Sequence, residues 1–228
     1  MKIIALICAR GNSKGIKNKN LLKFNKISLL GHAIRQSLKS KFIKRVVVST
    51  DSAKIAKEAV KYKAEIPFMR PIKLASSKSA EVDTWRHAIK NLDAKNQYDY
   101  IASIPTTSPL RSIKDINKCI SKAIKGKFDM VFTVTESTKN PYYNILKIKN
   151  KKLQEVCSDK KKIVRRQDSP KCYDLTTACY VFKPEYILKQ KNWLKGKTSF
   201  IVIPKERAID IDDKVDYKIA KIIAQKNL

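Results

Sequence analysis

Glycine and basic residues are concentrated in the loop that follows the first apolar run of the chain. Residues 3–9 read IIALICA, and the next segment, RGNSKGIKNKN at residues 10–20, holds two of the five glycines of the chain. Glycines allow positive φ angles and close approach to a ligand, so backbone N–H groups can surround an anion, and basic side chains add charge-assisted hydrogen bonds. The segment predicts a phosphate-binding loop with Arg10, Lys14 and Lys19 as side-chain donors.

The same loop has a simpler interpretation as a solvated basic turn. It contains neither the GxGxxG fingerprint of dinucleotide-binding folds nor the GxxxxGK[ST] sequence of P-loop ATPases. Its position after a strand nevertheless favours phosphate binding, because ligands of open α/β sheets collect at the carboxyl ends of the strands.

Four carboxylates are clustered near the C-terminus of a chain that has few acidic residues. In an extended segment, side chains two positions apart point the same way, so Asp210 and Asp212 would share one face. Beside triphosphate oxygens, two such ligands form an incomplete shell of the kind that Mg²⁺ prefers. The alternative is capping of the last helix, a role that we assign to Asp213 and Asp216.

Apolar periodicity indicates the elements that position these residues. Short apolar runs typical of strands occur at residues 3–9, 46–50, 98–104, 130–135, 178–182 and 200–203. Amphipathic helical patterns alternate with most of them, at residues 28–39, 52–62, 81–91, 113–125 and 215–225. This alternation predicts βαβ units, and hence an α/β fold whose mostly parallel sheet has helices on both faces.

One segment interrupts this pattern. Residues 142–156 place the polar residues 149–152 between two short apolar stretches, which indicates a hairpin inserted into the α/β frame. The basic segment 158–172 then predicts a loop that returns from the hairpin. We therefore predict a single domain over residues 1–228 with an insert at residues 139–172, which could pack on a partner subunit.

The strong positive charge raises nucleic acid as a possible partner. Lys and Arg number 50 against 20 Asp and Glu, a formal net charge of +30, but only nine of the basic residues are Arg and the lysines are spread along the chain. Arg dominates base-edge contacts and bidentate phosphate binding, so this composition argues against a nucleic-acid reader. An anionic small substrate remains compatible with it.

Cysteine usage and hydropathy predict a cytoplasmic protein. The five cysteines are odd in number and form no CxxC pair, which indicates reduced thiols rather than a disulfide framework. No stretch approaches the roughly 20 apolar residues of a membrane span, and the first residues lack a signal-peptide pattern. We therefore expect no membrane partner.

Taken in order, the motifs of the chain resemble those of the N-acylneuraminate (CMP-sialic acid) cytidylyltransferases. The resemblance is carried by CARGNSKG at 8–15, KNL at 19–21, STD at 49–51, RP at 70–71, TSPLR at 107–111, RQ at 166–167 and DID at 210–212. It implies a Rossmann-like α/β nucleotidyltransferase with an inserted dimerisation hairpin. Such an enzyme joins CTP to a nine-carbon 2-keto sugar acid, releases pyrophosphate, requires Mg²⁺ and is usually a homodimer.

The resemblance also implies roles for individual residues. CTP would be bound by Arg10, Gly11, Asn12, Ser13, Lys14, Gly15, Lys19, Asn20 and Arg70. The sugar side would be lined by Ser108, Arg111, Arg166 and Gln167, and the metal would be held by Asp210 and Asp212. Lys19, with Arg10, would stabilise charge on the α-phosphate, and Asp210 or a metal-bound water would accept the proton of the sugar hydroxyl.

Two positions depart from the sialic acid pattern and widen the expected range of acceptors. Pro105-Thr106 stands where Gln-Pro is usual, and Thr176-Thr177 stands where Asn-Gly is frequent. The expected acceptors therefore include sialic, legionaminic and pseudaminic acid, with 3-deoxy-octulosonate or a sugar 1-phosphate as alternatives. A basic nucleic-acid-binding protein is a further alternative, and it predicts binding that weakens steeply with salt.

Overall fold

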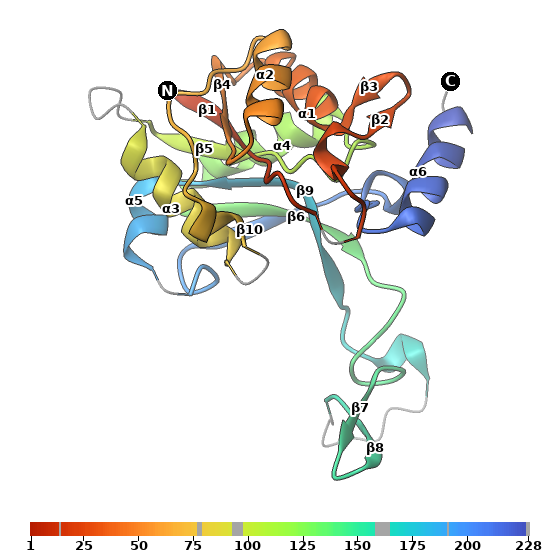
Figure 1. Cartoon of the computed structure of the whole chain (residues 1–228). Helices are drawn as coiled ribbons and strands as arrows, with labels where there is room; N and C mark the ends of the chain where they lie inside the picture. The colour runs from red at the N-terminus through yellow and green to blue at the C-terminus, as the bar shows by residue number, and fades with distance from the viewer. Residues whose placement is uncertain (14, 77–78, 93–97, 158–164, 191, 227–228) are drawn as a thin grey trace.

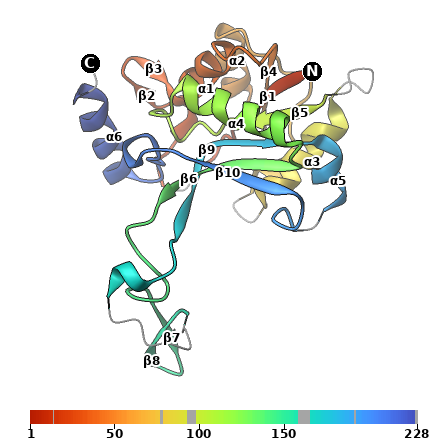
Figure 2. The same cartoon turned by 180° about the vertical axis from the view of Figure 1, so that it is seen from behind.

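The computed structural model describes residues 1–13, 15–76, 79–92, 98–157, 165–190 and 192–226 of the chain. Its centre is a six-stranded sheet with the order β10-β6-β9-β5-β1-β4 (Figures 1 and 2). The strands are β1 (Ile3–Cys8), β4 (Arg45–Ser49), β5 (Tyr100–Ser103), β6 (Met130–Glu136), β9 (Tyr173–Phe182) and β10 (Thr198–Val202).

Most of the strand pairs in the central sheet are parallel, as predicted from the sequence. β1 pairs in parallel with β4 and with β5, and β6 pairs in parallel with β10. β9 runs antiparallel to both of its neighbours, β5 and β6. The predicted α/β fold is therefore confirmed, with one antiparallel strand inside the sheet.

Helices cover both faces of the sheet. The side chains of β1 alternate between two buried clusters, with Ile3, Ala5 and Ile7 in one and Ile4 and Leu6 in the other. The first cluster includes α1 (Leu29–Leu38), α2 (Ala53–Lys61) and α4 (Ile113–Gly126), and the second includes α3 (Glu81–Asn91) and α5 (Pro184–Lys189). Burial on both faces explains why β1 is a continuous apolar run rather than an alternating one.

The C-terminal helix α6 (Lys214–Lys226) lies beside a small hairpin formed by β2 (Lys23–Phe24) and β3 (Ile27–Ser28) (Figure 1). Phe24, Leu29, Ile211 and Ala220 form a third buried cluster that joins these parts. The segment that precedes α6 is thereby held next to the loop that follows β1. None of the helices in the described part of the chain is long and apolar enough to cross a bilayer.

Residues 137–172, which we call the arm, leave the sheet between β6 and β9 and project away from the body (Figures 1 and 2). The predicted hairpin is confirmed as β7 (Leu146–Lys149) and β8 (Lys152–Glu155), and Asn150 and Lys151 adopt the left-handed conformation at its turn. Residues 158–164 of the predicted return loop lie outside the described residues. The 3-10 helices of the chain are η1 (Lys19–Leu21), η2 (Ile72–Ala75), η3 (Arg166–Asp168) and η4 (Lys205–Arg207).

Candidate active site

A cavity of about 500 Å³, which we call the main cavity, lies at the carboxyl ends of β1 and β5. It is lined by Cys8, Arg10, Ser13, Gly15, Lys19, Asn20, Glu81, Pro105, Thr106, Thr107, Thr177, Asp210 and Asp212. The basic loop after β1 and the acidic pair before α6 were predicted separately from the sequence, and the structure brings them to this one cavity. This is the edge where parallel strands of α/β proteins present their ligands.

Two glycines of the loop allow close packing rather than unusual backbone angles. A Cβ atom on Gly15 would lie 2.1 Å from the carbonyl oxygen of Asp212, so only glycine lets the loop contact the acidic segment. The Gly11 N–H donates to Asp51 Oδ1 over 2.9 Å. The expectation of positive φ at these positions is wrong, because no described glycine has one; in this loop Asn18 does, with φ of 56°.

Lys19 and Asp212 form an ion pair across the cavity, with 2.9 Å between Nζ and Oδ1. The lysine side chain is 13% exposed and the aspartate side chain is 75% exposed. The capping roles predicted for Asp213 and Asp216 are confirmed, because Asp213 accepts from the Asp216 N–H and Asp216 accepts from the Asp212 and Asp213 N–H groups. Asp212 is thus fixed through its backbone, which leaves its carboxylate at the cavity.

Asp210 is half-buried, and its Oδ1 has no hydrogen-bond partner in the described part of the chain. Burial raises the pKa of Asp210 and the nearby charge of Asp212 adds to the rise, whereas the hydroxyl of Thr107 and the charge of Lys19 oppose it. The segment is held in place by the Ile211 N–H, which donates to the Thr107 carbonyl over 2.8 Å. An oriented carboxylate oxygen without a partner is suited to a metal ion or a proton.

Glu81, the first residue of α3, is a member of the site that the sequence analysis missed. Glu81 is exposed at the cavities, but the protein around its carboxyl partly desolvates it, and this desolvation, with the charge of Asp210, raises its pKa to about 7. The Trp85 indole one turn further along α3 opposes the rise. Glu81 belongs to no recognised motif, so only the fold places it beside Asp210.

A second cavity of about 300 Å³, which we call the side cavity, adjoins the main one and shares Cys8, Arg10 and Glu81 with it. Its lining residues are Cys8, Arg10, Arg70, Leu74, Ser76, Ser79, Glu81 and Thr84. Arg70, predicted to bind nucleotide, is therefore found here rather than in the main cavity. Its Nη2 lies 3.4 Å from Asp51 Oδ1, the atom that also holds the Gly11 N–H.

Asn20 braces the loop while it lines the main cavity. Its Nδ2 donates to the Arg10 carbonyl over 2.8 Å, and its Oδ1 accepts from the Thr106 hydroxyl over 2.5 Å. The side chain therefore ties the loop after β1 to the loop after β5. Arg10 is also held by its own guanidinium, whose Nη1 donates to the Ser76 carbonyl over 3.1 Å.

The predicted sugar contacts of Arg111 and Ser108 do not fit the structure. Arg111 is buried, and its guanidinium donates to the backbone carbonyls of Ser108, Ala178 and Pro105. Burial lowers the pKa of Arg111 to about 10, so it stays charged at neutral pH. Ser108 is fully buried and its hydroxyl is hydrogen-bonded to the Thr177 hydroxyl. Both residues support the cavity wall from behind.

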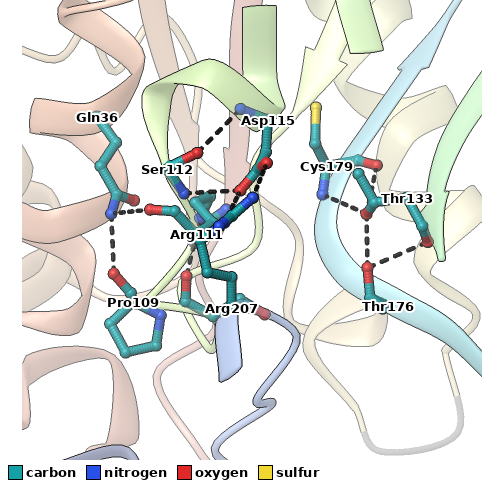
Figure 3. Close-up of polar contacts among 10 residues, drawn as sticks. Gln36, Pro109, Arg111, Ser112, Asp115, Thr133, Thr176, Cys179 and Arg207 are labelled. Atoms are coloured by element: carbon teal, nitrogen blue, oxygen red, sulfur yellow. Dashed lines mark hydrogen bonds and ion pairs between the residues drawn. The ribbon is translucent and has the colours of Figure 1, made fainter. Parts of the chain in front are cut away.

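Figure 3 shows how the loop after β5 is anchored around Arg111. Gln36 of α1 donates to the carbonyls of Pro109 and Arg111. Nearby, Arg207 donates to both carboxylate oxygens of Asp115 over 2.9 and 3.0 Å, and Asp115 also accepts from the Ser112 N–H at the start of α4. The Asp115–Arg207 pair connects α4 to the chain three residues before Asp210.

The other predicted site residues lie outside both cavities or outside the described residues. Gly11 and Asn12 belong to the loop but do not line a described cavity, and Lys14 lies outside the described residues. Arg166 begins η3 in the arm, and Gln167 lines a separate arm cavity of about 380 Å³. Within one chain, the arm residues and the main cavity are therefore not brought together.

Several site residues belong to segments noted in the sequence but were assigned no role there. Thr107 and Thr177 line the main cavity, and Asp51 holds both the loop and Arg70. The position of Asp51, two residues past the end of β4, is the one clue that strand placement offered. Cys8 also lines both cavities, and burial raises the pKa of its thiol to about 12, which keeps it neutral.

Comparison with known proteins relates the chain as a whole to the cytidylyltransferases. The profile of the cytidylyltransferase family matches residues 4–222. A post-translational flagellin modification protein B of Campylobacter coli is 35% identical over 230 residues, and a CMP-N,N'-diacetyllegionaminic acid synthase of Campylobacter jejuni is 36% identical over 230 residues. Both alignments cover 100% of this chain and 97% of the relative.

Solved structures with low sequence identity share the fold. A CMP:2-keto-3-deoxy-manno-octonic acid synthetase complexed with CTP has a TM-score of 0.75 at 11% identity, over 100% of both chains. The 4-diphosphocytidyl-2C-methyl-D-erythritol synthase of Anaerococcus prevotii has a TM-score of 0.69 at 15% identity, over 98% of both chains. Because the family profile matches residues 4–222 and the two Campylobacter relatives are 35% and 36% identical over the whole chain, the chain belongs to the cytidylyltransferase family.

Proposed function

We propose that this protein transfers CMP from CTP to the anomeric hydroxyl of a nine-carbon 2-keto sugar acid of the legionaminic, pseudaminic or sialic type. The observation that carries the proposal is the meeting of the basic loop and the acidic pair at one cavity, in a chain 36% identical to a legionaminic acid synthase over its full length. The products would be the CMP-sugar and pyrophosphate.

The triphosphate would lie along the loop after β1. Arg10, Ser13 and Lys19 line the cavity from this loop, and Gly15 brings the backbone close to the acidic segment. Lys19 contacts Asp212, so binding of the nucleotide would bring the same ammonium group near both carboxylate and phosphate oxygens. Such preorganised cations stabilise charge that develops on the leaving group without reorganisation at the moment of reaction.

Asp210 and Asp212 fit a Mg²⁺ ion bound together with the nucleotide. The buried Oδ1 of Asp210 has no hydrogen-bond partner among the described residues, and no group of three or more His, Cys, Asp or Glu there is arranged to hold a metal. Two carboxylates would thus leave the remaining positions to water and phosphate oxygens, the usual mode for Mg²⁺. When bound, the ion would neutralise triphosphate charge.

The chemical step needs positioning and a proton acceptor rather than a protein nucleophile. The anomeric oxygen forms a bond to the α-phosphorus, the bond to the bridging oxygen of the β-phosphate breaks, and pyrophosphate leaves. Asp210 is our candidate to take the hydroxyl proton, because its raised pKa brings it closer to the working pH of a general base. Thr107 and Thr177, which line the same cavity, would orient the sugar acceptor.

We also infer that the protein acts as a homodimer built through the arm. Ile148 and Leu153 are directly opposite each other in the hairpin and, with Leu146, make one apolar face; they are 77%, 68% and 54% exposed, respectively. An isolated two-stranded hairpin is marginally stable, so a second copy covering this face would stabilise it. The dimer would also let the arm residues Arg166 and Gln167 approach the cavity of a second copy.

A cytoplasmic location is part of the same proposal. The described cysteines are all free, as expected for a protein that works in a reducing compartment. We expect a dependence on CTP as the nucleotide donor, and no requirement for a membrane.

The test is pyrophosphate release by the purified protein with CTP and Mg²⁺, against sialic, legionaminic, pseudaminic and 3-deoxy-octulosonic acids. ATP, GTP and UTP serve as nucleotide controls, and Glu185→Gln, a substitution at the start of α5, serves as the protein control. We expect acid-dependent release with CTP and at least one nine-carbon acid. Release only with 3-deoxy-octulosonic acid would replace the proposed acceptor, and absence of CTP binding would refute the proposal.

A further inference from the structure

Glu81 is the one acidic residue that lines both the main and the side cavity. The main cavity already contains the residues proposed for triphosphate and metal binding. The side cavity opens from it past Cys8 and Arg10, which line both spaces. A nucleotide with its phosphates on the loop would therefore place its nucleoside end toward the side cavity.

The walls of the side cavity carry groups of opposite hydrogen-bonding character. Arg70 is 6% exposed, and its buried Nε has no hydrogen-bond partner within the described part of the chain, so this donor is available to a ligand acceptor. Arg10 is held at the shared edge by the Ser76 carbonyl. Glu81 supplies two carboxylate oxygens, and no described ion pair occupies them.

This arrangement matches the polar edge of cytosine. The base carries two acceptors, O2 and N3, followed by a donor, the exocyclic N4 amino group, and carboxylates accept from this amino group in nucleic-acid recognition. We propose that Glu81 accepts a hydrogen bond from cytosine N4 while Arg70 donates to the O2 and N3 side, so that Glu81 selects CTP over UTP. The inference rests on the proposed function, since it assumes that the nucleotide binds at this site.

Glu81 and Arg70 would both disfavour uracil, Glu81 at position 4 of the base and Arg70 at N3. Uracil has an oxygen acceptor at position 4, which would face the carboxylate of Glu81 with lone pairs on both sides. Its N3 is a donor and would face the guanidinium of Arg70. Arg70 is buried, so a ligand that leaves its donor unpaired is disfavoured, and the mismatch at Glu81 adds to this discrimination.

Two substitutions of Glu81 test its effect on the selectivity for CTP over UTP. Glu81→Gln keeps the size of the side chain, but an amide can turn either its oxygen toward cytosine N4 or its NH₂ group toward uracil O4. The selectivity for CTP over UTP should therefore fall in this variant. Glu81→Ala, a second variant, should lower the same ratio by removing the acceptor.

The experiment is calorimetric titration of the full chain with CTP and with UTP, at pH 8.5 with Mg²⁺, for the wild type, Glu81→Gln, Glu81→Ala and the control Glu185→Gln. We expect the ratio of the two dissociation constants to fall by about tenfold in both Glu81 variants and to stay unchanged in the control. Circular dichroism spectra and melting temperatures establish that each variant is folded.

Other outcomes overturn the inference in distinguishable ways. An equal weakening of CTP and UTP in Glu81→Gln would assign Glu81 to the ribose or phosphates, a conclusion that parallel titration with 2′-deoxy-CTP would sharpen. Wild-type selectivity for CTP that persists in both variants would overturn the inference while leaving the proposed function intact. A wild-type protein that binds neither nucleotide would overturn both.

Discussion

Three carboxylates at the main cavity differ in their surroundings, and the differences suit them to different tasks. Asp212 is well exposed and paired with Lys19, whereas Asp210 is half-buried with a partnerless Oδ1 and a raised pKa. Glu81 is exposed at the cavities, and desolvation together with the charge of Asp210 raises its pKa to about 7. Environment rather than residue type therefore separates the carboxylates proposed for metal and proton binding from the one proposed to contact the nucleobase.

The first prediction at this scale concerns Asp210. Asp210→Asn removes a charge and the proposed proton acceptor while keeping the shape of the side chain, so kcat should fall by about 100-fold or more. Binding of CTP without Mg²⁺ should change little, because the loop supplies the phosphate contacts. Steady-state kinetics and CTP titration with and without Mg²⁺ test this, with Asp83→Asn as the control; a kcat within threefold of wild type would contradict it.

The second concerns the pH dependence of stability at Glu81. The pKa of Glu81 is raised from 4.5 to about 7 in the folded state, so the folded protein binds the carboxyl proton more tightly than the unfolded chain does. The fold therefore loses stability as the pH rises from 4.5 to about 7. The Glu81→Gln variant has no carboxyl to ionise here, so it does not lose stability in this way. Allowing for the access of water to the carboxyl, we expect it to melt about 2–4 °C above wild type at pH 8 and equally at pH 4.5. A difference independent of pH would count against the raised pKa.

At the scale of elements, the site depends on loops that are tied to one another by single contacts. The loop after β1 is held to β4 through Asp51, to the loop after β5 through Asn20, and to the acidic segment through close packing at Gly15. The acidic segment is held in turn by the Thr107 carbonyl and by the Asp115–Arg207 pair. Loosening one contact should affect catalysis before it affects the core.

Gly15→Ala tests the close packing directly. The added methyl group would lie 2.1 Å from the Asp212 carbonyl oxygen, so the loop and the acidic segment must separate. We expect at least a tenfold loss of kcat/KM, the cost of a misplaced catalytic group, with a nearly unchanged melting temperature. Gly11→Ala is the matched control, since its nearest contact is 3.1 Å away. Equal activity of the two variants would refute this account of the loop.

Breaking the Asp115–Arg207 pair should lower the stability of the fold, in contrast to the change at Gly15, which should lower activity. Burial raises the pKa of Asp115, but hydrogen bonds from Arg207 and Ser112 outweigh it and lower the pKa overall. The pair therefore stabilises the fold above pH 3.8 and loses this effect as the pH falls through the lowered pKa. Arg207→Met should cost about 3 kcal/mol at pH 7. Urea denaturation at pH 7 measures it, and a cost below 1 kcal/mol would contradict the assigned role.

The sequence predicted the elements of the fold better than the contacts of the site. The helix α3 was predicted at its observed bounds, and the loop after β1 and the acidic pair were placed correctly because parallel strands present their carboxyl ends at one edge. The direction of β9 was not predictable, because apolar runs carry no strand direction. Arg111 looked like an anion ligand, since no local pattern reveals carbonyls that come from residues as distant as Ala178.

At the scale of the whole molecule, a packed α/β body carries an arm whose hairpin is exposed throughout (Figure 2). Leu146, Ile148 and Leu153 lie on one face of the hairpin, and Lys147, Lys149 and Lys152 lie on the other. Glu155, opposite Leu146, lies at the end of the apolar face, which is the side proposed to contact a partner copy. The body alone contains the main cavity, so the proposed assembly and the proposed nucleotide binding would use different parts of the chain.

The proposed dimer predicts the effect of a charge on the apolar face. Ile148→Glu combined with Leu153→Glu should convert a dimer into a monomer, because two carboxylates would be buried without partners. Lys147→Glu, on the opposite face, should leave the dimer intact. Light scattering after size-exclusion chromatography at micromolar concentrations measures both. A wild-type monomer, or a dimer that survives the double substitution, would exclude assembly through the arm.

The central claim is the transfer of a single phosphoryl unit, CMP, to a sugar hydroxyl, and ³¹P NMR of the reaction mixture tests it most directly. With CTP, Mg²⁺ and the nine-carbon acid that supports pyrophosphate release, the account predicts equal amounts of pyrophosphate and of a product with one phosphodiester phosphorus. The Asp210→Asn variant should form neither at a comparable rate. Pyrophosphate released without an equal amount of a phosphodiester product, or CDP and inorganic phosphate formed in place of both, would contradict the account.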